Sequence, residues 1–137
     1  MTIEPSALGA VALYAGLNIA ILVWISVAIG MIRTKNKILI GDGGNEHLAK
    51  AMRGHANAIE MMPMTLLALM LAALLGLWMP LIHALGLALT IGRLLHAYHF
   101  INADSAMWQR MAGFSLSVLA MLGSALSAVI LGLDALF

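Results

Sequence analysis

Three polar side chains at helical spacing stand directly before a long apolar run. Arg53, Asn57 and Glu60 follow one another at positions i, i+4 and i+7. At about 100° per residue, a helix places these side chains within about 60° of one another, whereas His55 points away from them. A cation, an amide and a carboxylate on one stripe form a groove wall that could hold a zwitterionic ligand.

A second polar stripe lies in a later apolar segment, within the sequence TIGRLLHAYHF. Arg93, His96 and Phe100 share a helix face within about 60°, and Tyr98 points elsewhere. Arg93 lies about 12 Å inside its apolar segment, a depth at which an ionisable residue usually faces a partner or a watery cavity. We expect Glu60 to be that partner. In the simplest alternative, the pair of Glu60 and Arg93 is only a structural lock between two helices.

The composition indicates that a membrane surrounds the elements that position these stripes. Hydrophobic residues make up 63% of the 137 residues, charged residues make up 9%, and the mean hydropathy is +1.00. These values leave too little polar surface for a soluble globule. Crossing about 30 Å of hydrocarbon takes roughly 20 apolar residues. Four segments are long enough, at about residues 8–32, 61–79, 81–101 and 111–133. We therefore predict an all-α integral membrane protein, with one bundle of four transmembrane helices over residues 1–137.

The connection between the first two spans contains a turn and the start of a helix. Its Gly-Asp-Gly-Gly run, residues 41–44, is a turn signal, and Asn45 can cap the helix that follows. The pattern predicts a helix over residues 46–79, which would approach about 50 Å and so extend beyond the membrane on the cytoplasmic side. Pro63 lies inside this helix and predicts a kink just past Glu60, because proline removes one backbone hydrogen bond.

The distribution of charge indicates an orientation. Five basic residues lie between the first and second spans, whereas the connection around residue 80 has no charge. By the positive-inside rule, the first connection is cytoplasmic and both termini face outward. The near-neutral balance of seven basic and six acidic residues gives no signal for nucleic acid. The absence of cysteine excludes disulfides and thiolate–metal sites, and we assign no metal ligand.

The two polar stripes carry a family resemblance. The pattern R-x-H-x-N-x-x-E-x-x-P at residues 53–63, followed by G-R-x-x-H at residues 92–96, resembles the MAPEG family, the membrane-associated proteins in eicosanoid and glutathione metabolism. The resemblance covers nearly the whole chain and is closest to the short bacterial members with a Gly-Asp-Gly-Gly turn. It implies a homotrimer in a bacterial inner membrane that binds glutathione between neighbouring subunits, near the cytoplasmic surface.

The resemblance also implies which residues bind glutathione as the co-substrate. The side chains that would hold the tripeptide belong to the two stripes: Arg53, Asn57, Glu60, Arg93 and His96. Arg33 or Lys35 would come from the adjacent subunit to meet a carboxylate, a group that arginine binds well. Arg110 is the candidate that activates the thiol, although it comes slightly later in the chain than the family pattern expects. Many members have a tyrosine where this chain has Phe100, which cannot donate a hydrogen bond to sulfur.

Three classes of function remain open. A glutathione transferase or peroxidase would join the thiolate to lipophilic electrophiles or reduce lipid hydroperoxides, with the second substrate entering from the bilayer. A non-catalytic binding protein for lipid or glutathione, with the same fold, is the alternative that the missing tyrosine keeps open. A small four-span transporter is the weakest of the three, since no acid lies deep in the first, third or fourth span.

The remaining features are interpreted as structural. We interpret His55 as an interhelical or headgroup contact, and His47 and His83 as solvated side chains. In the fourth span, a stripe of small residues within about 80° would let helices approach closely, either within the subunit or between subunits. The stripe consists of Gly113, Ser117, Ala120, Ser124 and Ala128.

Overall fold

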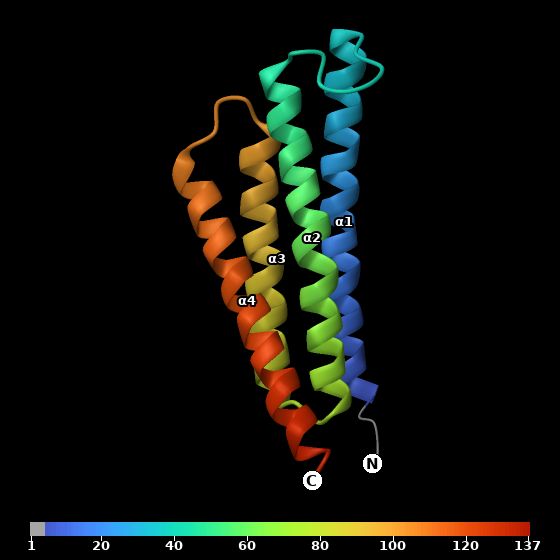
Figure 1. Ribbon diagram of the computed structural model, residues 1–137, viewed down its shortest axis with the longest axis vertical. Helices are drawn as coiled ribbons and strands as arrows, with labels where there is room; N and C mark the ends of the chain where they lie inside the picture. Colours follow the sequence, from blue (N-terminus) through green and yellow to red (C-terminus); the bar gives the residue numbers. More distant parts are fainter. Residues whose placement is uncertain (1–4) are drawn as a thin grey trace.

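The computed structural model describes residues 5–137. They form four helices: α1 (Pro5–Asn36), α2 (Glu46–Leu74), α3 (Met79–Ile101) and α4 (Met107–Asp134). The helices lie side by side along the long axis and alternate in direction (Figure 1). The α1–α2 and α3–α4 connections lie at one end, and the α2–α3 connection lies at the other end with the start of α1 and the end of α4. All four helices are long and apolar enough to cross a membrane, which confirms the predicted all-α fold with four spans.

Helices α2 and α3 form the centre of the bundle. Each packs against the other and against both α1 and α4, whereas α1 and α4 do not contact each other in the part of the chain that the structure describes. Two apolar clusters join α1, α2 and α3, one around Ile82 and the other around Ile25. The outer faces of α1 and α4 carry exposed apolar side chains such as Val27 and Leu126. Such faces suit contact with lipid or with another subunit.

Two helix ends differ from the prediction. α2 ends at Leu74 rather than at residue 79, and Gly76 then adopts a φ of +92°, in the region that glycine reaches at little cost. The sequence is apolar on both sides of this point, so hydropathy did not indicate where α2 ends. α3 begins at Met79. α4 begins at Met107 rather than at residue 111. Its first turn includes the polar Arg110, so the helix is longer than the apolar segment.

The start of α2 is built as predicted. Three glycines of the preceding turn have positive φ: Gly41 (+68°), Gly43 (+58°) and Gly44 (+74°). The side chain of Asn45 caps the helix by accepting a hydrogen bond from the N–H of Leu48 at 2.9 Å. The 29 residues of α2 extend about 44 Å at about 1.5 Å per residue, more than the hydrocarbon thickness. α2 stays helical through Pro63, and the kink there stays a prediction.

The small residues of α4 pack against α3 within the subunit. The buried members of the stripe are Gly113, Ser117, Ala120 and Ser124, and Ala128 is half-buried. Gly92 of α3 faces this stripe: a Cβ on Gly92 would lie 2.6 Å from Ser117 Oγ and 2.8 Å from the carbonyl oxygen of Gly113. The close crossing therefore depends on glycine in both helices. The sequence left open whether the stripe packs within the subunit or between subunits, and this contact lies within the subunit.

Polar side chains also join other helix pairs. Tyr14 OH of α1 lies 2.8 Å from His83 Nδ1 of α3, and Asn18 Nδ2 donates to Thr90 Oγ1 at 2.9 Å. His47 Nε2 of α2 donates to the last carbonyl of α3 at 2.9 Å. His83 is exposed, as predicted, and His47 is half-buried within α2. Each of the two rings is hydrogen-bonded to a neighbouring helix.

Candidate functional site

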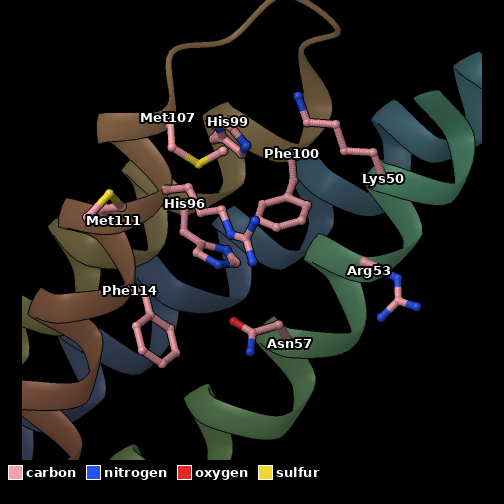
Figure 2. Close-up of a pocket in the computed structure, with 10 residues that line it drawn as sticks. Lys50, Arg53, Asn57, His96, His99, Phe100, Met107, Met111 and Phe114 are labelled. Carbon is pink, nitrogen blue, oxygen red and sulfur yellow. The ribbon is translucent and has the colours of Figure 1, made fainter. Parts of the chain in front are cut away.

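A cavity of about 680 Å³ opens between α2, α3 and α4 at the end of the bundle that carries the α3–α4 connection (Figure 2). This volume is within the range of small-molecule sites. The three helices supply its lining: Lys50, Arg53, Asn57, His96, His99, Phe100, Met107, Arg110, Met111 and Phe114. None of these lining residues is acidic, so the cavity is cationic.

Helix α2 brings a cation and an amide to the cavity, one turn apart. Arg53 is exposed and has no hydrogen-bond partner among residues 5–137, so its guanidinium is free to bind a ligand. Asn57 Oδ1 accepts a hydrogen bond from Arg93 Nη1 at 2.8 Å. Because that bond uses the oxygen, the N–H groups of Asn57 remain as its donors toward a ligand.

Arg93 lies behind the cavity wall. It is 1% exposed, and besides its bond to Asn57 its Nε donates to Ser117 Oγ at 2.7 Å. Its Nη2 is buried without a partner in the part of the chain that the structure describes. Arg93 thus joins α3 to both α2 and α4 and orients the amide of Asn57. The family resemblance implied that Arg93 contacts the ligand, whereas in the structure it does not line the cavity.

The predicted partnership between Glu60 and Arg93 is wrong. Arg93 bonds to Asn57 and Ser117, and within residues 5–137 no ion pair joins it to Glu60. Glu60 is exposed and does not line the cavity, since it lies about 10 Å further along α2 than Arg53. A carboxylate paired inside the bundle would also have to lose its surrounding water, which is costly. The contact that joins α2 to α3 is instead the bond between Arg93 and the neutral Asn57.

Phe100 is the centre of an aromatic cluster at the end of α3. Its ring stacks on His96 with centroids 4.5 Å apart and 26° between the planes, and His99 meets it edge-on at 5.2 Å. Gly54 of α2 permits this position, because a Cβ there would overlap with the Phe100 side chain. The guanidinium of Arg110 lies over the ring, 5.7 Å from its centroid. Arg110 of α4 thus reaches the same cavity as the stripe of α3.

Lys50 holds the α3–α4 connection in place. Its Nζ donates to the carbonyl oxygens of Asn102 at 2.8 Å and Ala103 at 3.2 Å, and to Ser105 Oγ at 2.9 Å. These three bonds use all the donors of the ammonium group. Lys50 therefore satisfies carbonyls at the end of α3 and is not free to bind a ligand.

The sequence analysis missed part of this lining. Lys50 lies three residues before Arg53, and His99 lies three residues after His96, so i, i+3 spacing was a signal for both. The sequence analysis also missed the wall from α4, which consists of Met107, Met111 and Phe114. Met107 lies before the start of the predicted helix, and Met111 and Phe114 lie inside it but were assigned to no face. A helix begun at residue 107 places these three side chains and Arg110 on one face.

Arg33 lies outside the cavity of its own chain. It borders a separate groove of about 300 Å³ between α1 and α2, together with Ser26, Met52 and His55. His55 Nε2 lies 3.0 Å from Ser26 Oγ, which confirms His55 as an interhelical contact. Arg33 Nη2 donates to Met52 Sδ at 3.4 Å, and its Nη1 is buried without a partner among the described residues.

The fold and the site define a class of protein: a four-helix membrane protein with a cationic cavity at one end of its bundle, bordered by an apolar wall. The sequence model of the MAPEG family matches residues 11–130, and the chain belongs to this family. The inner membrane protein YecN of Escherichia coli strain K12 is 34% identical over 89 residues, which cover 65% of this chain and 68% of YecN. The protein of the same name from E. coli O6:H1 strain CFT073 gives the same values.

Proposed function

We propose that the protein binds glutathione in the cavity between α2, α3 and α4 and uses it as the co-substrate of a transferase or peroxidase reaction on lipophilic molecules. The observation that carries this proposal is the combination of Arg53 and Arg110 with an apolar wall in one cavity that has no acid in its lining. Glutathione carries two carboxylates, one ammonium group and one thiol, so a cationic cavity suits it. Membership of the MAPEG family supports the same ligand.

The residues of α2 and α3 would bind the peptide. Arg53 would form a bidentate pair with one carboxylate, and the N–H groups of Asn57 would donate beside it. His96 lines the cavity, and its ring nitrogens have no hydrogen-bond partner within residues 5–137, so they would meet polar groups of the ligand. Arg93 would act through Asn57. Glu60 would take part only where a neighbouring subunit extends the site beyond the cavity of one chain.

Arg110 would stabilise the thiolate of glutathione. A guanidinium beside the sulfur lowers the pKa of the bound thiol, because it favours the negative form. With an aryl halide, the thiolate forms a carbon–sulfur bond and the halide leaves. With a lipid hydroperoxide, the sulfur takes the distal oxygen and the alcohol leaves, after which a second glutathione forms the disulfide and releases water. The apolar wall of α4 would receive the lipophilic substrate from the bilayer.

We further propose a homotrimer whose cavities face the cytoplasm of a bacterial inner membrane. In this assembly Arg33 would reach the cavity of the adjacent subunit, which would give its unpartnered Nη1 an acceptor. The orientation rests on the basic residues between α1 and α2. Because the natural chain has no cysteine, Leu39→Cys and Leu136→Cys can test it with an impermeant maleimide. Labelling of both variants from the same side would contradict the proposed orientation.

Calorimetry of glutathione binding to the detergent-purified protein tests the site. We expect the wild type to bind and Arg53→Ala to bind at least about tenfold more weakly, since a hydrogen bond to a charged group contributes about 1.5–3 kcal/mol. The matched control is Lys37→Gln, which removes an exposed cation outside the cavity and should leave the affinity unchanged. An unchanged affinity in Arg53→Ala would show that the site assignment is wrong.

A binding protein without turnover is the second candidate, and Phe100 is the observation that favours it, because its ring has no donor for a thiolate. A conjugation assay with an aryl halide separates the two functions. Conjugation that falls in Arg110→Gln supports the enzyme. Binding without conjugation supports the second candidate. Absence of glutathione binding in the wild type refutes the enzyme and any glutathione-binding role, and leaves only lipid binding of the second candidate.

A further inference from the structure

Phe100 is held on several sides in the cavity wall. His96 stacks on its ring, His99 meets the ring edge-on, and Gly54 of α2 lies against its first side-chain atoms. These contacts come from two helices and leave the ring little freedom to rotate or shift. The contacts therefore restrict the direction in which the ring faces the cavity, where Figure 2 shows it beside His96.

Arg110, unlike Phe100, is not held by close packing. It is exposed, and within residues 5–137 it makes no hydrogen bond or ion pair. Its guanidinium carbon lies over the ring of Phe100, 5.7 Å from the ring centroid. A guanidinium at this distance from an aromatic face is attracted by the negative face of the ring. Arg110 is long and exposed, so it can adopt many rotamers. The attraction favours those rotamers that keep its guanidinium over the ring.

We propose that Phe100 is a positioning residue, which holds the guanidinium of Arg110 over the cavity through a cation–π contact. The catalytic consequence rests on the proposed function of Arg110 as the group that stabilises the thiolate. Phe100 itself has no donor for sulfur, so it acts only through Arg110. The residue that fixes the activating cation is thus an apolar ring from a different helix, and the direction of the ring depends on Gly54.

Two substitutions of Phe100 separate the effect of its aromatic face from the effect of its side-chain volume. Phe100→Leu keeps most of the side-chain volume against Gly54 but removes the aromatic face, whereas Phe100→Tyr keeps the face. Tyr98→Leu is the matched control, because it removes an exposed aromatic side chain from the same helix outside the cavity. Thermal unfolding and size-exclusion profiles of all three variants show whether each one folds and assembles.

The first measurement follows the thiolate. With saturating glutathione, we expect Phe100→Leu to lose most of the ultraviolet absorbance of the thiolate and about tenfold in kcat, while KM for glutathione changes by less than about twofold. Phe100→Tyr should retain both quantities, and Tyr98→Leu should match the wild type. An equal loss in Phe100→Leu and Phe100→Tyr would overturn the proposal, as would a loss confined to KM.

The second measurement needs no glutathione, so it separates this proposal from the proposed function. In protein with ¹⁵N-labelled arginine, the Nε–Hε signal of Arg110 is identified by its disappearance in Arg110→Lys. We expect a ring-current shift of this signal in the wild type and in Phe100→Tyr, and a shift toward the unstructured value in Phe100→Leu. An identical signal in the wild type and Phe100→Leu would refute the positioning role even if glutathione binds. Failure of the wild type to bind glutathione refutes only the function.

Discussion

Arg93 is a buried cation whose recorded hydrogen bonds go to two neutral side chains. Its Nη1 donates to Asn57, which lines the cavity, and its Nε donates to Ser117, which does not. Keeping a charged group inside an apolar bundle is costly unless hydrogen bonds compensate for the loss of water. The two bonds therefore contribute to different properties. The bond to Ser117 contributes to stability, and the bond to Asn57 contributes to stability and also orients an amide that lines the cavity.

Substitution of the two acceptors separates these properties. Ser117→Ala should lower the stability by about 1–3 kcal/mol, because Nε of Arg93 loses its acceptor, and should leave glutathione affinity within about twofold of the wild type. Asn57→Ala should weaken binding by about tenfold, because it also removes the donors that face the ligand. Thermal unfolding and calorimetry in the same detergent measure both effects. If Ser117→Ala weakened binding as much as Asn57→Ala, the direct role of the amide would be refuted.

At the scale of the elements, the close crossing of α3 and α4 positions the site. Gly92 and Gly113 bring the two backbones together, and this contact sets the distance between Phe100 near the end of α3 and Arg110 in the first turn of α4. At the opposite wall, Lys50 of α2 is bonded to the connection between the same two helices. The cavity is thus bordered by three helices whose relative positions depend on the glycine contacts and on the hydrogen bonds of Lys50.

Gly92→Ala tests the crossing. The added Cβ would lie 2.6 Å from Ser117 Oγ and 2.8 Å from the backbone carbonyl of Gly113, so the helices must separate, and we expect a loss of about 1–3 kcal/mol in stability. Gly16→Ala is the matched control, since nothing lies within 4 Å of a Cβ there. It should be neutral or stabilising by up to about 1 kcal/mol, owing to the higher helix propensity of alanine. Equal melting temperatures for the two variants would contradict this account of the packing.

Taken as a whole, one chain leaves an apolar outer surface that suits contact with lipid or with another subunit. α1 and α4 keep most of their apolar side chains on the outside, and Arg33 borders a groove separate from the cavity. In a closed ring all junctions between subunits are equivalent, so a groove that met the neighbour's cavity at one junction would do so at every junction. The proposed trimer therefore predicts that each glutathione site combines Arg53 of one subunit with Arg33 of the next.

Mixing of subunits tests this combination. Homotrimers of Arg33→Ala and of Arg53→Ala should each bind glutathione weakly. Co-expression should restore binding in about one in three cavities of mixed trimers, because each mixed ring has one junction with both arginines. Calorimetric stoichiometry of doubly tagged, purified assemblies measures the recovery. Absence of recovery, with mixed trimers confirmed by native mass spectrometry, would show that Arg33 does not complete a neighbouring site.

Reading the chain alone was enough to predict the membrane class, the four spans and the end of the bundle that carries the polar stripes, because these properties follow from local hydropathy and helical spacing. The same reading also predicted the capped start of α2, since glycines with positive φ and an asparagine cap act within a few residues. The two polar motifs indicated the MAPEG family, which the family match over residues 11–130 confirms.

Which polar groups meet could be seen only once the helices were packed together. Glu60 and Asn57 both follow Arg53 on one stripe, but the height at which α2 crosses α3 brings Asn57 to Arg93 and leaves Glu60 outside. The contact between Phe100 and Arg110 likewise depends on how closely two helices approach. Helical periodicity specifies a direction around one axis, whereas a partnership between side chains also needs the distance and offset between two axes, which packing sets.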